Sequence, residues 1–505
     1  MKVVTYGGTI RAHHTEYRQA LENGECTPFV LPQHIASYFF LICCLMFSIG
    51  RSTIVRWCTF LTIILHSFLV MRYSRSLGLA HGVTIGIASS WSVLVAIDLL
   101  FIRHPANHFR RVTCRKSVPT VPVRTNDIRH QRPETSLEWQ PMPRSVLQRL
   151  FWYMDLLGSM RLLHWSAQHN PDKQDCLHKH VSVCHRNTLS VKRCIFRLCV
   201  IYIAIDVLKE VVAMDPYFWG HTQASIPPQV EFLITSPFLT RGYRLSVAFV
   251  LLYLAIALVT ESGQLVFLHI LGPNVAGAWG QDWAYKPQYG SLSSIYAHGL
   301  RGFWGTTWHQ MFRHMLTSSS NKMVLLLPLD TQGPTAKALR LSFPFVISGI
   351  IHGCGSYTLW GDTRPLQAIL FFLLQPLGIA VQSLHGLAVD RVIGDSILGV
   401  HVNGISNVIS TAIFFLLTFP LLADDFAKGG LWLSEPFPIS VMQSLRLGST
   451  QRAHSLWLNS GIGWYPGRHW WQAGIAVWTW SCEVWCHWIW RLHRLYCVGE
   501  WTISI

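Results

Sequence analysis

Two histidines stand out because each lies where a titratable side chain is costly. His309 follows Trp308 in a segment rich in aromatic residues and glycine, and His352 interrupts the apolar run 345–355. Ionisable residues inside apolar stretches of membrane proteins usually carry function. Imidazole is also the side chain best suited to take up a proton near neutral pH. The two histidines therefore predict proton-transfer chemistry within a membrane.

The residues around His309 predict a helix with one aromatic face. At 100° per residue, the segment 301–316 brings its large apolar side chains into one stripe, made of Trp304, Trp308, Met311, Phe312 and Met315. His309 lies beside this stripe, and Gly302 and Gly305 lie near it in projection. Glycine weakens a helix by about 1 kcal/mol, so both glycines indicate a place where a ligand approaches the backbone. An interfacial helix anchored by its tryptophans is the structural alternative.

The residues around His352 predict a helix face of small side chains with a base at its centre. Ser348 precedes His352 by one turn, Ser356 follows by one turn, and Gly349 lies nearby in projection. Close packing of two helices through small residues would explain the same pattern. We count Ser348 among the candidate substrate contacts. A loop at 317–336 is expected to fold the two histidine segments back on one another.

These residue types fit the transfer of an acyl group from a thioester to an alcohol. The reaction needs a base for the hydroxyl proton and hydrogen-bond donors for the oxyanion. His352 can serve as the base, and His309, Trp308 or Gln310 could donate to the thioester carbonyl oxygen. The sequence shows no Gly-x-Ser-x-Gly nucleophile segment, which favours direct transfer. Cys354 lies two residues from His352 and points elsewhere on a helix.

The basic charge of the chain is concentrated in one long segment. The net charge is +16, and residues 103–193 are polar, basic and interrupted by prolines. By the positive-inside rule this segment is expected to face the cytoplasm, where it would attract anionic lipid headgroups or polyanionic coenzyme A. Arg301 and Arg313 are closer candidates for the coenzyme A phosphates. No nucleic-acid-binding module is recognisable, so nucleic acid is not an expected partner.

Composition and hydropathy predict an all-α, multi-pass transmembrane helical bundle. Half of the residues are apolar and only 13% are charged, about half of the charged share usual in soluble proteins. About 7 to 9 segments have the length and polarity of a membrane span. They are 36–48, 53–72, 78–102, 194–213, 245–272, 338–356, 365–385 and 404–423, with a further candidate near 470–490.

These segments divide the chain into five parts. We expect a polar N-terminal tail (1–30), N-terminal transmembrane helices (31–102), the basic cytoplasmic loop with an interfacial helix (103–193), a catalytic membrane region (194–425), and a loop with a Trp-rich C-terminal segment (426–505). The first residues lack the basic start and apolar core of a cleavable signal peptide.

Two further sets of residues could be mistaken for sites. His385 and Asp390 have the His-x4-Asp spacing of glycerolipid acyltransferases, but a helix does not hold residues i and i+5 on one face. A second set offers zinc ligand types at spacings that match no structural site, namely Cys176, His178, His180, Cys184 and His185. We therefore expect no metal ion, and the 13 scattered cysteines predict no disulfide framework.

The segment Phe303-Trp-Gly-Thr-Thr-Trp-His-Gln310, followed by His352 between small residues, resembles the wax synthase family of membrane-bound O-acyltransferases. Within it, the chain is most similar to acetyltransferases of fungal terpenoid and meroterpenoid pathways. Supporting matches are the stretch from Asp155 through Arg161 to Trp165 and the pair Asp215-Pro216.

The resemblance implies an MBOAT-like fold and places His352 as the general base, with His309 positioning the reacting groups. It also implies acetyl-CoA or another acyl-CoA as cosubstrate, no bound cofactor, and a lipophilic alcohol, above all a terpenoid, as acceptor. The expected location is the endoplasmic reticulum membrane. Thr306 and Thr307 stand where relatives often carry a basic residue, and Gly299 replaces a bulkier polar residue, as Gly302 does. These departures concern the contacts to the acyl donor more than the base.

Two other functions are compatible with the same residues. A long-chain-alcohol or sterol O-fatty-acyltransferase would use the same catalytic parts with a different acyl tunnel. A multi-pass transporter could use intramembrane histidines to relay protons, but it should show repeated halves with matching broken helices, and the sequence contains no such repeat.

Overall fold

The computed structural model describes most of the chain in a series of segments. These are residues 5–47, 52–116, 135–166, 190–232, 234, 236–393, 396–435, 440–445, 447–448, 460–465, 472 and 474–479. The Cys and His set at 176–185 and the Trp-rich residues 480–505 lie outside these segments, so the predictions for them are not addressed by the structure.

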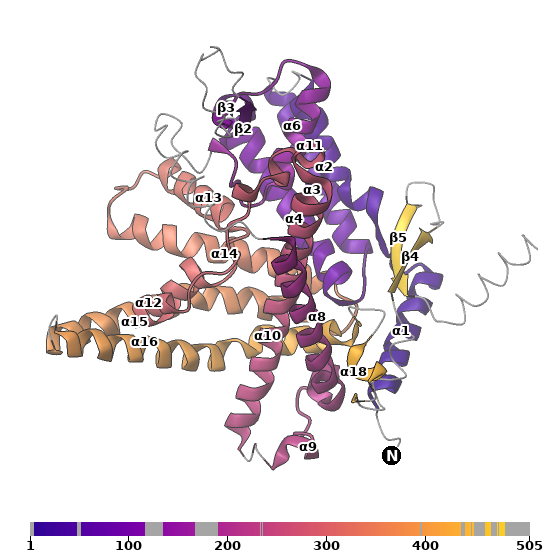
Figure 1. Cartoon of the computed structure of the whole chain (residues 1–505), viewed down its shortest axis with the longest axis vertical. Coiled ribbons are helices and arrows are strands. Elements are labelled where there is room, and N and C mark those ends of the chain that lie inside the picture. The colour runs from indigo at the N-terminus through magenta and orange to yellow at the C-terminus, as the bar shows by residue number, and fades with distance from the viewer. Residues whose placement is uncertain are drawn as a thin grey trace, which may run out of the picture.

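Helices form most of the described structure (Figure 1). In chain order they are α1 Tyr6–Asn23, α2 Leu31–Met46, α3 Thr53–Tyr73, α4 Thr84–Ile97, α5 Pro105–His108, α6 Val146–Gly158, α8 Val191–Met214, α9 Pro228–Glu231, α10 Pro237–Gln264, α11 Gly272–Ala276, α12 Ser293–Gly302, α13 Arg313–Leu326, α14 Pro334–Thr358, α15 Pro365–Ile393, α16 Ile397–Thr418, α17 Pro420–Lys428 and α18 Val441–Ser444. Serines cap several of them, because the side chains of Ser190, Ser236 and Ser396 accept hydrogen bonds from free N–H groups of the first turn.

Six of the described helical stretches are long and apolar enough to cross a membrane. They are Thr53–Tyr73, His81–Ile102, Pro237–Gly280, Pro334–Thr358, Pro365–Val392 and Ile397–Lys428. Two other predicted spans are also helical. α2 is apolar but has only 16 residues, and α8 has 24 residues with Asp206, Lys209 and Glu210 buried along it. The chain is thus an all-α, multi-pass integral membrane protein.

The helices that carry the two histidine segments pack around α15. α14 lies along α15 and α4, while α12 lies against α16 and α15. Figure 1 shows α12, α15 and α16 side by side, with α13 and α14 next to them. One apolar core joins α8, α10, α15 and α17, and a second joins α2, α3, α4 and α6.

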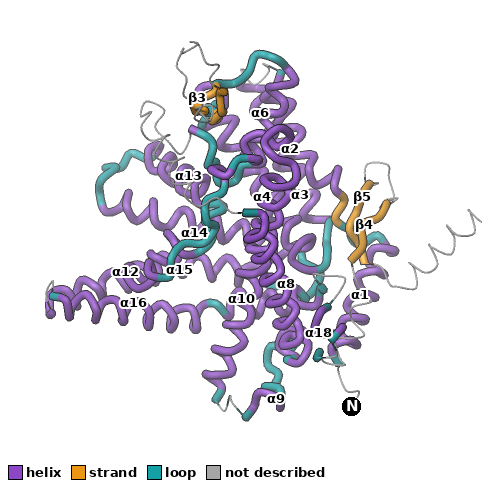
Figure 2. Tube along the Cα trace, viewed as in Figure 1, coloured by secondary structure: helices purple, strands orange, loops and turns teal. Residues whose placement is uncertain are grey.

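Strands lie only at the margins of the described structure (Figure 2). β2 (Arg111–Lys116) pairs antiparallel with β3 (Thr135–Gln140), from Arg111 opposite Gln140 to Lys116 opposite Thr135. The basic segment, expected to be irregular, therefore contains a small sheet as well as α6. β5 (Gly474–Thr479) lies between β1 (Phe29–Val30) and β4 (Ser460–Tyr465). The candidate span near 470–490 is wrong for residues 474–479, which form an extended strand.

The N-terminal segment is more ordered than the polar tail that was expected. α1 occupies most of it, and Tyr6, Ile10 and Tyr17 are fully or almost fully buried. The Tyr6 hydroxyl donates to Glu435 Oε1 at 3.3 Å and accepts from Lys209 Nζ at 3.0 Å. These partners are far away in the sequence, so the local pattern could not indicate that α1 packs on the membrane helices.

Candidate active site

The segment carrying His309 is not the single helix that the periodicity predicted. α12 ends at Gly302, residues Phe303–Thr307 form a π-helical turn, and Trp308 is extended with φ −71° and ψ 158°. A helix resumes only at Arg313 and continues to Leu326. Because α14 begins at Pro334, the loop expected at 317–336 is shorter than predicted. π-helical turns are rare and often occur at functional sites. They also redirect each side chain of the motif.

The aromatic residues predicted to form one stripe instead pack against three different parts of the structure. Trp304 packs against Phe345 of α14 and Phe372 of α15, with ring centroids 5.7 and 5.9 Å away. Trp308 stacks on Phe303 at 5.6 Å. Phe312 contacts Trp91 of α4 at 4.8 Å. The motif is therefore wedged between spans and does not lie on one face of a surface helix.

His352 lies within α14, and one of its ring nitrogens is hydrogen-bonded to the backbone. Its Nδ1 lies 2.8 Å from the main-chain oxygen of Ser348 and 3.5 Å from the Ser348 hydroxyl. A carbonyl oxygen can only accept, so Nδ1 carries the proton and Nε2 of the neutral ring has a lone pair. The ring also stacks on Phe372 at 4.4 Å. This contact fixes its plane.

His309 is a second neutral imidazole near His352. Burial, together with a smaller effect of His352, lowers the pKa of His309 to about 3. Its buried Nδ1 has no hydrogen-bond partner among the described residues, and its ring contacts Trp308 and Phe312. A neutral imidazole with an uncommitted nitrogen can donate to, or accept from, a bound ligand.

Of the other predicted site residues, one is exposed and two are engaged in hydrogen bonds. Arg301 is exposed. Arg313 donates to the main-chain oxygen of Gly305 and, at 3.0 Å, to Gln310 Oε1. Gln310 Nε2 donates to the oxygen of Trp308 at 2.6 Å. Arg313 and Gln310 thus brace the turn that carries His309.

Residues 286–291 form a strap beside the motif, which the sequence did not indicate. The Gly290 amide donates to the Thr307 oxygen at 3.1 Å, and the Gln310 amide donates to the Gln288 oxygen at 3.2 Å. Arg161 Nη1 donates to the main-chain oxygen of Lys286 at 2.8 Å. Arg161, noted only as part of the resemblance, therefore ties the segment after α6 to the strap.

A small cavity lies one aromatic ring away from His309. Its lining comes from α4, α6 and α13 and from the segments that flank them, and includes Trp91, Asp98, Phe109, Leu156 and Met315. The space of about 20 Å³ is sufficient for a water molecule. Phe312 contacts both Trp91, which lines the cavity, and His309.

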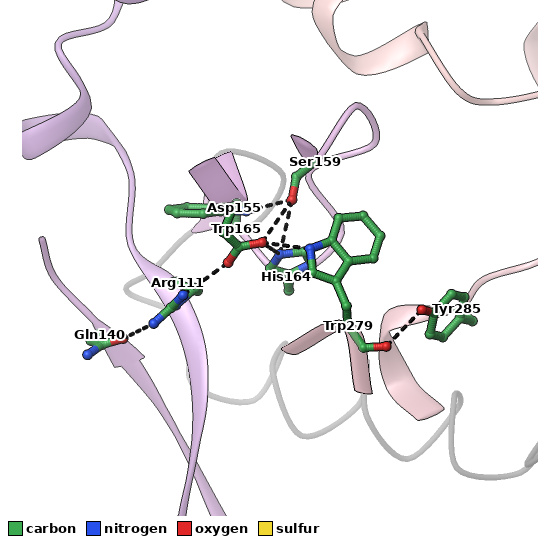
Figure 3. A network of polar contacts seen from close by, with 8 residues as sticks. All are labelled: Arg111, Gln140, Asp155, Ser159, His164, Trp165, Trp279 and Tyr285. Atoms are coloured by element: carbon green, nitrogen blue, oxygen red, sulfur yellow. Dashed lines mark hydrogen bonds and ion pairs between the residues drawn. The ribbon is translucent and has the colours of Figure 1, made fainter. Parts of the chain in front are cut away.

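The second histidine cluster of the molecule surrounds Asp155 and resembles a catalytic triad only in composition (Figure 3). His164 Nε2 lies 3.0 Å from Asp155 Oδ1 and 3.1 Å from Ser159 Oγ. A triad needs the carboxylate and the hydroxyl on opposite ring nitrogens, whereas here both face the same one. This cluster therefore lacks the geometry of a relay.

Further donors surround the same carboxylate. Trp279 Nε1 donates to Asp155 Oδ1 at 2.8 Å and Arg111 Nη1 donates to Oδ2 at 3.1 Å. Burial alone would raise the pKa of Asp155, but the hydrogen bonds and charges of His164 and Arg111 outweigh it and lower the pKa. The cluster joins β2, α6 and the chain near α11, and is a structural crosslink.

The alternative pair His385 and Asp390 does not form a unit. His385 Nε2 lies 2.7 Å from the Ser406 hydroxyl, and Asp390 accepts from Asn403. Both side chains are exposed on α15. Among the described residues, no group of three or more His, Cys, Asp or Glu side chains could hold a metal ion.

Comparison with known proteins identifies the region that contains both histidines. The model of the "Membrane bound O-acyl transferase family" matches residues 285–374, which span the strap, the motif, α13, α14 and the start of α15. No solved structure matches.

Several fungal proteins are similar to the chain over longer stretches. The O-Mevalon transferase yanI of Aspergillus niger is 32% identical over 27% of this chain and 34% of its own length. The O-Mevalon transferase macI of Penicillium terrestre is 26% identical over 52% of this chain and 58% of its own. The acetyltransferase eriL of Hericium erinaceus is 24% identical over 60% of this chain and 73% of its own. The chain thus spans about a third of the length of yanI and just over half of the length of macI.

The matched segment contains the turn with His309 and the span with His352, and membrane helices surround both. The sequence resemblance rested on the same residues. Residues 285–374, which include both histidines, are thus similar to the membrane bound O-acyl transferase family.

Proposed function

We propose that the chain transfers an acetyl group from acetyl-CoA to a hydroxyl group of a lipophilic secondary metabolite of the terpenoid or meroterpenoid class. One observation carries the proposal. His352 holds its proton on Nδ1, against the main-chain oxygen of Ser348 at 2.8 Å, and so offers Nε2 as a base. The names of the relatives, acetyltransferase and O-mevalon transferase, support acyl transfer as the reaction class.

In this mechanism His352 Nε2 accepts the proton of the alcohol as its oxygen attacks the thioester carbonyl carbon. The carbonyl oxygen becomes an oxyanion, and a ring N–H of His309 donates to it. When the tetrahedral intermediate collapses, the C–S bond breaks and the coenzyme A thiolate takes the proton from His352. His352 returns to its neutral form, His309 stays neutral throughout, and no acyl-enzyme is formed.

The surroundings of both rings support this assignment. Trp304 and Trp308 pack within the motif, and Phe372 packs against His352. An apolar surrounding of this kind strengthens hydrogen bonds to developing charge. Arg301 is exposed at the end of α12, where its guanidinium can pair with coenzyme A phosphates. We place the enzyme in the endoplasmic reticulum membrane, with its substrates drawn from the cytosol and the bilayer.

The test uses membranes from a host that expresses the full chain. Isotope-labelled acetyl-CoA and a panel of terpenoid alcohols are added, and lipid extracts are analysed by mass spectrometry. We expect alcohols heavier by one labelled acetyl unit. Parallel reactions with long-chain acyl-CoA test the fatty-acyl alternative. If no ester forms above the level of membranes that lack the chain, with any donor, the proposal is wrong.

A further inference from the structure

α12 is broken immediately before the His309 motif. Gly299 has φ 55° and ψ −134°, a conformation that side chains with a Cβ rarely adopt. In a regular helix the Leu300 amide would donate to the Tyr296 carbonyl. At this break, each of these two backbone groups instead has a side-chain partner.

The two partners are amide side chains from different membrane helices. Gln382 of α15 accepts from the Leu300 amide through Oε1 at 2.7 Å. Asn407 of α16 donates from Nδ2 to the Tyr296 carbonyl at 3.1 Å. Backbone polar groups left unsatisfied within lipid cost several kcal/mol each. The side chains therefore replace one lost helical hydrogen bond with two specific ones.

The Gln382 side chain is also bound to the backbone and neighbours of Asn407 on α16. Gln382 Nε2 donates to the main-chain oxygen of Asn407 at 3.1 Å, to the Ser410 hydroxyl at 2.6 Å and to Thr411 Oγ1 at 3.2 Å. Only 9% of Gln382 is exposed. A Cβ at position 299 would overlap the Gln382 amide, so the break and the glutamine fit one another closely.

α15 contacts both halves of the candidate site. Phe372 stacks on the His352 ring at 4.4 Å. Gln375 Oε1 accepts from Trp304 Nε1 in the motif at 2.9 Å. Gln382 lies two turns beyond Gln375 on the same helix face and holds the start of the motif. α15 thus links the His309 turn to His352 through side chains on one helix.

We infer that Gln382, together with Asn407, is a positioning residue that holds the broken helix α12 so that His309 faces His352. This inference rests on the proposed acyl transfer. A displacement of about 1 Å between reacting groups can cost on the order of 100-fold in rate. Loss of the Gln382 amide should therefore lower kcat much more than it weakens substrate binding.

The first measurement is the rate of acetyl transfer by Gln382→Leu in membranes, normalised to the amount of folded protein. We expect kcat to fall by about tenfold or more, with KM for acetyl-CoA within about twofold of wild type. Gln367→Leu is the matched control, because Gln367 lies on the same helix away from the motif. Gln382→Glu keeps an oxygen acceptor for Leu300 and should recover part of the rate.

Asn407→Leu provides a second variant that leaves Gln382 in place. It removes the donor to the Tyr296 carbonyl and should lower kcat in the same direction, with a smaller effect. A kcat within twofold of wild type in both variants overturns the positioning role.

Hydrogen–deuterium exchange reports on the break without relying on activity. In purified protein, peptides that cover residues 296–304 should exchange faster in Gln382→Leu than in wild type or Gln367→Leu, because the Leu300 amide loses its acceptor. Unchanged exchange overturns the contact itself. If wild type makes no ester while exchange still responds to Gln382→Leu, the proposed function has failed and the catalytic role of Gln382 fails with it, although the contact is real.

Discussion

The molecule contains two histidine clusters that differ in how their polar atoms are used. Around Asp155, the carboxylate, His164 and Ser159 are bonded to one another and to Arg111 and Trp279. At the other site, His309 and His352 are set among aromatic rings. His352 has one ring nitrogen fixed on a main-chain oxygen, and His309 Nδ1 has no partner among the residues that the structure describes.

This difference separates a structural cluster from a candidate catalytic one. In a network whose polar atoms are hydrogen-bonded to one another, each hydrogen bond adds stability, and these atoms are not available to bind a substrate. An imidazole that is oriented through one nitrogen and unsaturated at the other is prepared for proton transfer. The catalytic proposal therefore concerns His309 and His352, whose rings have fewer hydrogen-bond partners, although the Asp155 cluster contains the residue types of a hydrolase.

Asp155→Ala should produce the largest change in stability. Removing a carboxylate from a buried ion pair leaves Arg111 and His164 without their shared partner, which costs roughly 3 kcal/mol or more. We expect much less folded protein in membranes, while each folded molecule keeps an acetyl-transfer rate within about threefold of wild type. Thermal unfolding in detergent and a rate per folded molecule check both parts. A normal unfolding temperature combined with abolished transfer would assign catalysis to the wrong cluster.

His309→Ala should impair the chemistry more than the fold. Loss of one donor to a developing oxyanion costs on the order of 100-fold in kcat, and we expect a decrease of about 10- to 100-fold with KM for acetyl-CoA nearly unchanged. Steady-state kinetics in membranes provide the measurement. Asn at this position retains an N–H donor, so His309→Asn should be the milder variant, and equal rates for both variants would argue against an oxyanion donor.

Acid should destabilise the protein partly through His309. The pKa of this ring is about 3 in the folded protein and 6.5 as the ordinary value, so between these values the unfolded chain binds the proton and the folded chain does not. Stability therefore falls as pH decreases from about 6.5 towards 3 and is unaffected above that range. Between pH 7 and pH 5, His309→Gln should remove up to about 2 kcal/mol of this loss.

Unfolding temperatures of both proteins at the two pH values test this expectation. His385→Gln serves as the matched control, because it makes the same substitution at a histidine that is exposed on α15. The same slope in all three proteins would show that His309 is not buried in its neutral form.

Ser348→Ala should have the smallest effect. The main-chain oxygen of Ser348 accepts from His352 at 2.8 Å, whereas the hydroxyl is 3.5 Å away, so alanine preserves the bond that orients the ring. We expect kcat within about twofold of wild type. A loss of tenfold or more would show that the hydroxyl contacts the substrate, as the sequence had suggested for this residue.

The sequence sufficed for features that depend on local pattern. Long apolar runs predicted the membrane helices, because about twenty such residues are needed to cross a bilayer. Helical spacing placed Ser348 one turn before His352, and the two residues do meet, although through the main-chain oxygen.

Features that depend on distant partners could not be predicted. The helix expected at 301–316 is interrupted by the π-helical turn Phe303–Thr307. The preceding helix α12 is broken where Gly299 meets Gln382 and Tyr296 meets Asn407, and glycine alone does not distinguish a break from a tolerated residue in a helix. The sequence signal that could have identified Gln375 and Gln382 is the presence of glutamine inside an apolar span. α1 is joined to distant parts of the chain by the hydrogen bonds of Tyr6 with Glu435 and Lys209, a combination that no local pattern contains.

The most direct test of the central claim is the rate of acetyl transfer by His352→Ala, normalised to folded protein and compared with His385→Ala on the neighbouring helix. If His352 takes the proton of the alcohol, kcat should fall by about 10²- to 10⁴-fold while the amount of folded protein stays normal and His385→Ala keeps the wild-type rate. A His352→Ala variant that transfers acetyl groups within tenfold of wild type would contradict the account.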